Sequence, residues 1–474
     1  MQALTAPLRE LAEYEDIVKQ REKGTGMIKI TGCVNSQKTH LMYALSDGYT
    51  YKVIACASES KAKQIYEEYR FLDSSVYLYP AKDLLFYQAD IRSKELIKQR
   101  MEVVQAVIEG GPVTVITSFD AFMDSLISRE EIKKRILNIA GEGTLDMNAL
   151  IHELAKLGYD REVQVEMPGQ FAVRGGILDI YPLTEERPVR IELWGEEVDS
   201  IRTFDVETQR SIERLEEIAV CPATEFPEEE RGRVSFLDYF PVKESILFLD
   251  EPVRLIEKGD AVAEEFMEAQ KRRLESGHEL TDAEAALYQP REIIQKINAY
   301  TSIGFMALEM QCRGFHTKNS YSLQTKSVQS YNRSFELLTQ DLKRLKRNKS
   351  RVVLLSGSRT RAKRLAEDLR DYNLSSFYSD DMEREAGPGE IMTAYGHVAE
   401  GYEYPLLKFT VISETDIFGK AKKKKKRKVY EGRKIQSFSE LKPGDYVVHE
   451  NHGLGIYQGI EKIEVDKVSK DYMK

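Results

Sequence analysis

Cysteine, histidine and tryptophan are scarce in this sequence. Its 474 residues include four cysteines, seven histidines and one tryptophan. His449 and His452 are close to each other, but without further ligands nearby they predict no metal site. The cysteines match neither a metal-binding nor a redox spacing, which indicates a reducing, cytosolic compartment. They are Cys33, Cys56, Cys221 and Cys312.

Long apolar runs are lacking as well. No stretch is apolar over a membrane-spanning length, and the N-terminus does not have the profile of a signal peptide. The composition, 42% hydrophobic and 31% charged, is that of a soluble globular protein with about three to four domains. The formal net charge of -9 argues against a surface that binds nucleic acid everywhere, so any basic contact must be local. These features predict a cytoplasmic protein.

The N-terminal part alternates short apolar segments with amphipathic ones. Such alternation is typical of an α/β domain with a parallel sheet. A buried strand returns at residues 245–255, as though the same domain resumed after an insertion. The predicted strands of the first part are residues 27–31, 51–57, 74–80 and 112–118, and the predicted helices are 61–72 and 94–110.

One of these strands leads into the outline of a phosphate-binding loop. Gly32 is followed by four residues, then by Gln37 and the pair Lys38-Thr39. In such a loop the lysine reaches the terminal phosphates and the hydroxyl residue ligates magnesium. Gln37 stands where the pattern has glycine, and a Cβ at a strained position costs about 1–3 kcal/mol. The loop is therefore degenerate.

A second feature of nucleotide sites lies further along the chain. Asp250 and Glu251 end an apolar strand, where an ATPase places a magnesium-binding acid and a water-polarising acid. The alternative is a solvated acidic turn. Together with the imperfect loop, the acids favour the remnant of an ATPase site over that alternative.

The segment after Gly141 has a different pattern. Residues 162–182 and 187–205 are runs of strands separated by glycine turns, which predicts a small antiparallel β insertion. The strand period of two places Val189, Ile191 and Leu193 on a core face and Arg190, Glu192 and Trp194 on the other. The only tryptophan then lies beside an arginine, a pair enriched in binding hot spots. We expect Arg174 to point toward the same patch. The alternative is that Trp194 covers the edge of a thin core and the charges are solvated.

The last third predicts three further segments. Residues 351–372 and 406–419 form another strand–helix unit. Eight of the nine residues from Lys420 to Lys428 are cationic, which predicts a solvated tether, with a nonspecific phosphate contact or a nuclear import signal as alternatives. Residues 441–465 are glycine-punctuated strands of a small barrel, for which Gly444, Gly453, Gly455 and Gly459 supply turns. Since the chain stops within this barrel, we expect it to be the front portion of a longer protein.

The order of these features resembles a known family. Along the chain come the imperfect loop, the insertion with VRGGILDIYP and VDSIRTFD, the Asp-Glu strand, VVLLSGSRTRAKRLAEDLRDY and GHVAEGYEYPLLKFTVISETDIFG. This resembles UvrB, the helicase-like protein of nucleotide excision repair, in the version found at the front of the transcription-repair coupling factor (Mfd) family. The likeness covers nearly the whole chain, and the two insertion motifs are its specific part.

Three departures from UvrB bear on activity. The loop has Gln37, residues 79–95 are too short for the long aromatic hairpin that clamps damaged DNA, and no QxxGRxxR helix follows TDIFG. In UvrB-like motors the arginines of that helix close the ATP site. A cation facing the γ-phosphate accelerates phosphoryl transfer by orders of magnitude, so without these arginines we expect negligible hydrolysis. No cofactor is expected for this chain; ATP and Mg²⁺ would serve the motor of the whole family protein.

The resemblance also implies partners. The insertion is similar to a UvrA-docking domain, with Arg174, Arg190 and Trp194 as the expected contacts. The C-terminal segment resembles the start of a CarD-like domain that interacts with RNA polymerase. DNA would be contacted mainly by the whole protein and by the Lys420–Lys428 region. In this family, the protein recognises RNA polymerase stalled at DNA lesions, displaces it by ATP-dependent translocation and recruits UvrA.

The sequence thus predicts an α/β fold: degenerate helicase-like (RecA/P-loop) parallel-sheet domains, a small inserted β-rich domain and a truncated C-terminal β-barrel-like domain. Two other function classes stay open, an active UvrB-like DNA-dependent ATPase or helicase and a purely structural interaction protein. The predicted segments are 1–135 (UvrB-like), 136–225 (UvrA-docking insertion), 226–335 (return to the UvrB-like domain), 336–419 (second α/β domain), 420–436 (basic linker) and 437–474 (start of the polymerase-interacting domain).

Overall fold

A computed structural model describes most of the chain. The described residues are 1–82, 94–224, 234–275, 287–419, 444, 446–449, 453–458, 460–465 and 468–473. The Lys420–Lys428 block and most of the segment 79–95 lie outside them. The chain divides into two compact units, Met1–Ala421 and Lys422–Lys474. The predicted mixed α/β class is confirmed.

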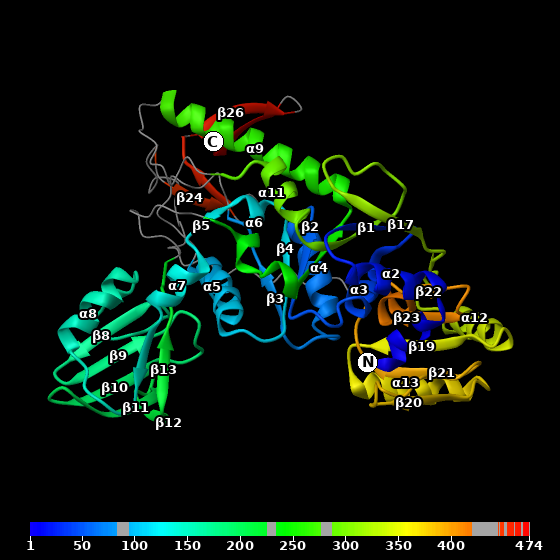
Figure 1. The fold of residues 1–474 in the computed structure, drawn as a ribbon, viewed down its shortest axis with the longest axis horizontal. Coiled ribbons are helices and arrows are strands. Elements are labelled where there is room, and N and C mark those ends of the chain that lie inside the picture. Colours follow the sequence, from blue (N-terminus) through cyan, green and yellow to red (C-terminus); the bar gives the residue numbers. More distant parts are fainter. Residues whose placement is uncertain are drawn as a thin grey trace. The chain divides into compact units, whose positions relative to one another are not determined.

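A seven-stranded sheet, in which all neighbouring strands are parallel, organises the first unit (Figure 1). Its inner strands β4, β15 and β16 are buried along their whole length, as expected when helices cover both faces of a parallel sheet. In order across the sheet the strands are β17 (Thr317–Ser322), β1 (Gly26–Thr31), β16 (Thr301–Met306), β15 (Ser245–Asp250), β2 (Tyr51–Cys56), β4 (Val113–Ser118) and β3 (Val76–Tyr79).

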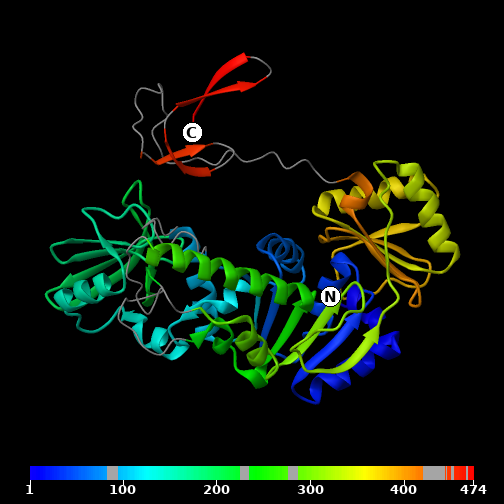
Figure 2. The same cartoon turned by 90° about the horizontal axis from the view of Figure 1, so that it is seen from above.

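Helices follow these strands as the α/β pattern predicts. Ser58 caps α4 by accepting a hydrogen bond from the Lys61 amide, which satisfies one of the free N–H groups at the helix start. The 24-residue α9 is the longest helix among the described residues and runs as one rod in Figure 2. The helices of this part are α1 (Gln2–Thr5), η1 (Ala6–Glu10), α2 (Ala12–Glu22), α3 (Asn35–Ala44), α4 (Glu59–Tyr69), α5 (Lys94–Glu109), α6 (Asp120–Met123), α7 (Arg129–Arg135), η3 (Phe236–Tyr239), η4 (Val242–Glu244), α9 (Pro252–Glu275) and α11 (Pro290–Ile297).

A separate six-stranded sheet forms the inserted β-rich part. It is antiparallel except for a short parallel pair, β7 with β8, and helix α8 (Met147–Lys156) lies against it. Sequence patterns did not predict that helix. The strand order is β12 (Ser211–Leu215), β11 (Glu197–Phe204), β10 (Val189–Trp194), β9 (Ile177–Tyr181), β8 (Gln170–Arg174) and β7 (Asp160–Arg161). Two further antiparallel pairs are β13 (Glu217–Val220) with β6 (Leu137–Ala140), which packs in the core of the insertion, and β14 (Val234–Ser235) with β5 (Ser125–Leu126), which packs in the core of the first α/β part.

A second α/β sheet follows the first. Four of its strands are parallel, and two antiparallel strands extend one edge. Its order is β18 (Lys326–Ser327), β22 (Tyr402–Tyr404), β23 (Phe409–Ser413), β19 (Arg351–Ser356), β21 (Ile391–Tyr395) and β20 (Ser376–Ser379), with helices α12 (Phe335–Arg347), α13 (Arg359–Asp371) and α14 (Glu414–Phe418).

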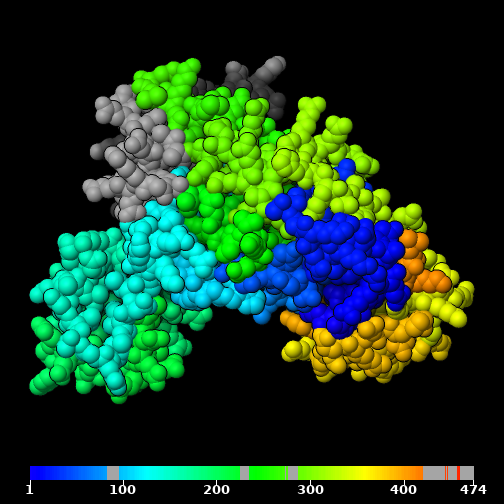
Figure 3. Space-filling view, viewed as in Figure 1, coloured from blue at the N-terminus to red at the C-terminus, as the bar shows by residue number. Residues whose placement is uncertain are grey.

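The two α/β sheets share one hydrophobic core. Buried side chains of β1 and β19, including Ile28, Ile30 and Val353, belong to the same contiguous cluster. In the space-filling view the blue N-terminal atoms abut the yellow and orange atoms of the second sheet (Figure 3). A continuous core of this kind resists separation, because opening it would expose apolar surface on both sides.

The second unit consists of two antiparallel hairpins in its described residues. They are β24 (Tyr446–His449) with β25 (Gly453–Ile456) and β26 (Ile460–Val465) with β27 (Val468–Met473). No closed barrel is formed by the residues that the structure describes. Across the described ranges, no helix is long and apolar enough to span a membrane.

Candidate functional site

The charged residues of the predicted nucleotide site do come together, and they bind one another. The ammonium group of Lys38 donates hydrogen bonds to Asp250 Oδ1 at 2.7 Å and to Glu251 Oε1 at 2.6 Å. The side chains of Lys38 and Asp250 are only 7% and 6% exposed. Burial alone would lower the pKa of Lys38, but the two carboxylates outweigh it and raise that pKa. Lys38 is therefore protonated, and the carboxylates of Asp250 and Glu251 compensate its positive charge.

The backbone fixes the two carboxylates in this position. Asp250 is the last residue of β15, and Glu251 has a φ of 55°, a left-handed value that is uncommon for a residue with a side chain. The Glu251 amide donates to the Phe305 carbonyl of β16, and Glu251 Oε1 accepts from the Ala307 amide at 2.9 Å. Both acids thus face Lys38 from the carboxyl edge of the sheet.

Gln37 does not carry the backbone strain that the sequence argument assigned to its position. It lies in the first turn of α3, is fully buried, and its Oε1 accepts from the Val34 amide at 3.2 Å. The positive φ falls on Asn35 instead, at 21°. Since the helix already begins at Asn35, a Cβ at position 37 meets ordinary helical geometry.

Gly32 and Thr39 have other neighbours than a phosphate or a metal. Gly32 has a φ of 80°, and a Cβ added there would lie 2.3 Å from the Leu323 carbonyl oxygen. The close approach of another chain segment therefore requires this glycine. Thr39 is buried and its hydroxyl lies against Glu68, away from the Lys38 group.

An open cavity of about 510 Å³ lies beside the Lys38 group. It is polar, and a ligand phosphate at Lys38 would have to displace Asp250 or Glu251. A magnesium ion would equally have to displace the ammonium group from the carboxylates. No group of three or more metal-ligating side chains occurs among the described residues. The cavity is lined by Cys33, Val34, Asn35, Lys38, Ala57, Ser58, Ser60, Lys61, Gln64, Asp250, Glu251, Arg254, Ala307 and Ser327.

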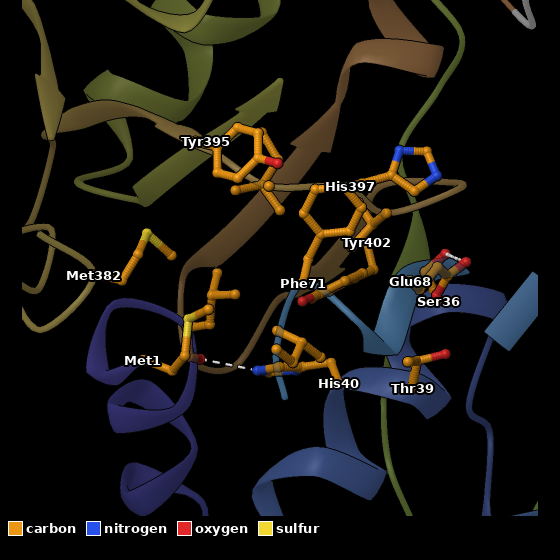
Figure 4. A pocket seen from close by; sticks show the side chains of 15 residues that line it. Met1, Ser36, Thr39, His40, Glu68, Phe71, Met382, Tyr395, His397 and Tyr402 are labelled. Atoms are coloured by element: carbon orange, nitrogen blue, oxygen red, sulfur yellow. Dashed lines mark hydrogen bonds between the residues drawn. The ribbon is translucent and has the colours of Figure 1, made fainter. Parts of the chain in front are cut away.

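The neighbouring face of α3 is joined to the second α/β sheet. His40 is fully buried, with Nδ1 2.9 Å from the Tyr404 hydroxyl and Nε2 2.9 Å from the Leu4 carbonyl oxygen, and its ring stacks on Tyr402. Burial lowers the pKa of His40 to about 4, so the ring is neutral at physiological pH. Figure 4 shows His40 and Tyr402 lining a pocket of about 20 Å³, room for roughly one water.

A buried carboxyl group closes the same junction. Glu68 Oε1 accepts from Ser36 Oγ at 2.8 Å, drawn as a dashed line in Figure 4, and from the Ala399 amide at 3.2 Å. Burial raises the pKa of Glu68. Because Ala399 lies in the loop between β21 and β22 of the second α/β sheet, these bonds connect α3 and α4 to that part of the chain. Side chains fill this part of the junction, whereas the polar cavity beside Lys38 is open.

The β-rich sheet presents the second group of predicted site residues. Val189 and Ile191 are buried as expected, whereas Leu193 is only half-buried. Trp194, at the end of β10, is 84% exposed. The alternative in which Trp194 covers a core edge is therefore wrong for this side chain. An exposed tryptophan is available to a partner, and tryptophan is enriched in binding hot spots.

The two predicted arginines lie on the same face and share one acid. Arg174 donates to Asp179 Oδ2 at 2.6 Å, and Arg190 donates to Oδ1 at 2.7 Å and to Oδ2 at 2.9 Å. Asp179 is 1% exposed, Arg190 13% and Arg174 46%. Sequence reasoning missed Asp179, although an acid on the strand ILDIY, directly opposite Arg190, was a usable signal.

Comparison with known proteins assigns these parts to a family. Residues 137–226 match the family model described as the UvrB interaction domain, and residues 441–474 match the CarD-like/TRCF RID domain. The chain is 29% identical to the transcription-repair-coupling factor of Bacillus subtilis (strain 168), in an alignment covering 98% of this chain. The chain is similar to the transcription-repair-coupling factors over nearly its whole length. The resemblance predicted from sequence is thereby confirmed.

Other transcription-repair-coupling factors match over somewhat less of the chain. Those of Staphylococcus epidermidis (strain ATCC 35984) and Staphylococcus haemolyticus (strain JCSC1435) are each 27% identical over 85% of this chain. The alignments cover 45% of the Bacillus protein and 39% of each staphylococcal one, so the chain spans less than half the length of these relatives.

Proposed function

We propose that this chain acts in transcription-coupled nucleotide excision repair as a recruiting scaffold. In this proposal the β-rich insertion docks UvrA, the second unit binds RNA polymerase, and the two α/β sheets hold them without turning over nucleotide. Recognition of stalled polymerase and its displacement by ATP-driven translocation on DNA belong to the whole protein, in the bacterial cytoplasm. The observation that carries the proposal is the match of residues 137–226 to the UvrB interaction domain, on which Trp194 is exposed.

The same proposal assigns the segments of the chain. Residues 1–135 and 226–335 form the UvrB-like part, 136–225 the UvrA-docking insertion and 336–419 the second α/β domain. Residues 420–436 are a basic linker, whose Lys420–Lys428 block adds a nonspecific contact with DNA. Residues 437–474 begin the polymerase-interacting domain, in keeping with the CarD-like/TRCF RID match.

Two contacts support a scaffold over an ATPase. Lys38 is paired with Asp250 and Glu251, so the group that would bind phosphate is already occupied. His40, Tyr402 and Glu68 fill one part of the junction of the two sheets and hold the sheets together there. Motor proteins of this class need a junction that opens and closes around nucleotide. An active UvrB-like ATPase or helicase is the rival, and DNA-stimulated turnover by the purified chain would favour it.

Binding to purified UvrA tests the docking role. The chain is immobilised and UvrA is titrated, with Trp194→Ala as the test variant and Leu308→Ala as the matched control, since Leu308 is also 75% exposed. Loss of a central aromatic contact costs about 2 kcal/mol or more, which is roughly thirtyfold in affinity. We expect that loss for Trp194→Ala and none for Leu308→Ala. Equal affinities of all three proteins would remove Trp194 as a contact, and a wild type that does not bind UvrA would remove the docking assignment.

A further inference from the structure

Arg174 and Arg190 differ in what they can offer a partner. Arg190 uses its guanidinium internally: Nε and Nη2 bind Asp179, Nη2 also donates to Gln209 Oε1 at 2.9 Å, and Nη1 lies 3.5 Å from the Gln209 carbonyl oxygen. Its guanidinium also lies 4.4 Å from the ring centroid of Phe204. With 13% of the side chain exposed, Arg190 is a supporting group more than a contact.

Arg174 has the opposite character. Among the described residues its guanidinium makes one hydrogen bond, from Nη2 to Asp179 Oδ2 at 2.6 Å, and 46% of the side chain is exposed. A guanidinium has five N–H donors in a fixed plane, so the remaining ones face solvent. The one anchored nitrogen restrains the guanidinium and leaves its other N–H donors available to a partner.

The register of the sheet places this guanidinium beside Trp194. Arg174 is opposite Ile177, which is opposite Glu192, and the exposed Trp194 follows two residues later, past a register shift between Glu192 and Leu193. Two strand spacings separate the strands of Arg174 and Trp194, roughly 10 Å. The turn that brings β8 and β9 together needs Gly176, where an added Cβ would lie 2.7 Å from the Leu193 carbonyl oxygen. An aromatic face and a guanidinium fork at this separation form one contact surface.

We propose that Asp179 is a positioning residue that, braced by Arg190, holds Arg174 in a fixed orientation to bind a carboxylate group of the partner. A planar guanidinium is the side chain that matches a carboxylate with two parallel hydrogen bonds. Pre-orienting it lowers the entropy lost on binding, because the rotamer is already fixed in the free protein. The partner is UvrA, so the assignment rests on the proposed function. It reassigns Arg190 from direct contact to support.

A double-mutant cycle on the full chain separates positioning from a merely structural role. UvrA affinity is measured for Arg174→Ala, Asp179→Asn and the double variant. A charge-assisted hydrogen bond is worth about tenfold or more, so each single variant should weaken binding by that amount. The double variant should be no weaker than Arg174→Ala, since Asp179 acts only through Arg174. Arg214→Ala on β12 is the charge-matched control and should bind as the wild type does.

Two further variants keep the test informative if Asp179→Asn folds poorly. Asp179→Glu retains the charge and both ion pairs but moves the carboxylate outward, and should still weaken binding severalfold. Arg190→Ala should weaken wild-type binding but not that of Arg174→Ala. Losses that multiply in the double variants would overturn the positioning role, as would Asp179 variants that bind UvrA like the wild type. A wild-type chain that does not bind UvrA would refute the proposed function itself. If Trp194→Ala weakens UvrA binding but the Asp179 variants bind like the wild type, only the positioning role of Asp179 is refuted.

Discussion

Replacing Lys38 by methionine separates an internal ion pair from a working phosphate-binding lysine. The Lys38 ammonium is held between Asp250 and Glu251, and the three side chains are 7%, 6% and 20% exposed. Removing one partner of a buried ion pair leaves uncompensated charge and costs about 3–5 kcal/mol. Because Glu251 is partly reached by water, we expect a loss near the lower figure, about 3 kcal/mol. A lysine kept for an absent phosphate would instead be stability-neutral when replaced.

The assay is urea unfolding followed by far-UV circular dichroism. Lys61→Met is the matched control, because Lys61 lines the same cavity and should change stability by less than about 0.5 kcal/mol. The triple variant Lys38→Met, Asp250→Asn, Glu251→Gln should recover most of the loss, since it leaves no charge unpaired. A Lys38→Met protein as stable as the wild type would refute the internal ion pair as the role of this lysine.

Three further outcomes follow from particular contacts. Burial lowers the pKa of His40 from 6.5 to about 4, so between these pH values the unfolded chain binds a proton that the folded chain does not. The free energy of unfolding should therefore be unaffected by His40 above pH 6.5 and fall by about 3 kcal/mol as the pH is lowered toward 4. His40→Gln should reduce this pH dependence, which is measured by unfolding the protein at a series of pH values. Gly32→Ala should lower the urea midpoint far more than Gly24→Ala. Both glycines have a positive φ, but only at position 32 would the added Cβ clash with the Leu323 carbonyl oxygen. Equal midpoints of the two variants would contradict this. Trp194→Ala should leave the unfolding curve unchanged, since an 84% exposed side chain supports little of the core, and a destabilised variant would show that Trp194 is structural.

Much of the fold was predictable because apolar periodicity sets it. The strands β2, β3, β4 and β15 and the helix α5 lie within the predicted segments, and β1 and α4 begin one and two residues before theirs. What periodicity does not encode is the order across a sheet: β15 and β16 lie between β1 and β2, although more than 200 residues separate them from β1. The N-terminal residues 2–22 also escaped prediction, since their helices gain stability mainly by contact with the rest of the chain.

The candidate sites were predictable in their residues but not in their contacts. Lys38, Asp250 and Glu251 were identified by motif and do meet, yet no spacing reveals that they neutralise one another. Gln37 was assigned a strain that the structure does not have, because the sequence does not show where a helix starts to within two residues. Arg190 was expected to face a partner, but a buried acid on the neighbouring strand binds its guanidinium. Whether a charged side chain is available to a partner depends on its neighbours on adjacent strands, and a single sequence gives little information about which strands are adjacent.

Nucleotide turnover by the purified chain tests the central claim most directly. The hydrolysis of Mg²⁺-ATP is measured with and without DNA, for the wild type and for Lys38→Met under identical conditions. If Lys38 is held by Asp250 and Glu251 and does not bind phosphate, both proteins hydrolyse ATP at the same background rate and DNA does not raise that rate. Turnover that DNA stimulates and that disappears with Lys38→Met would contradict the account.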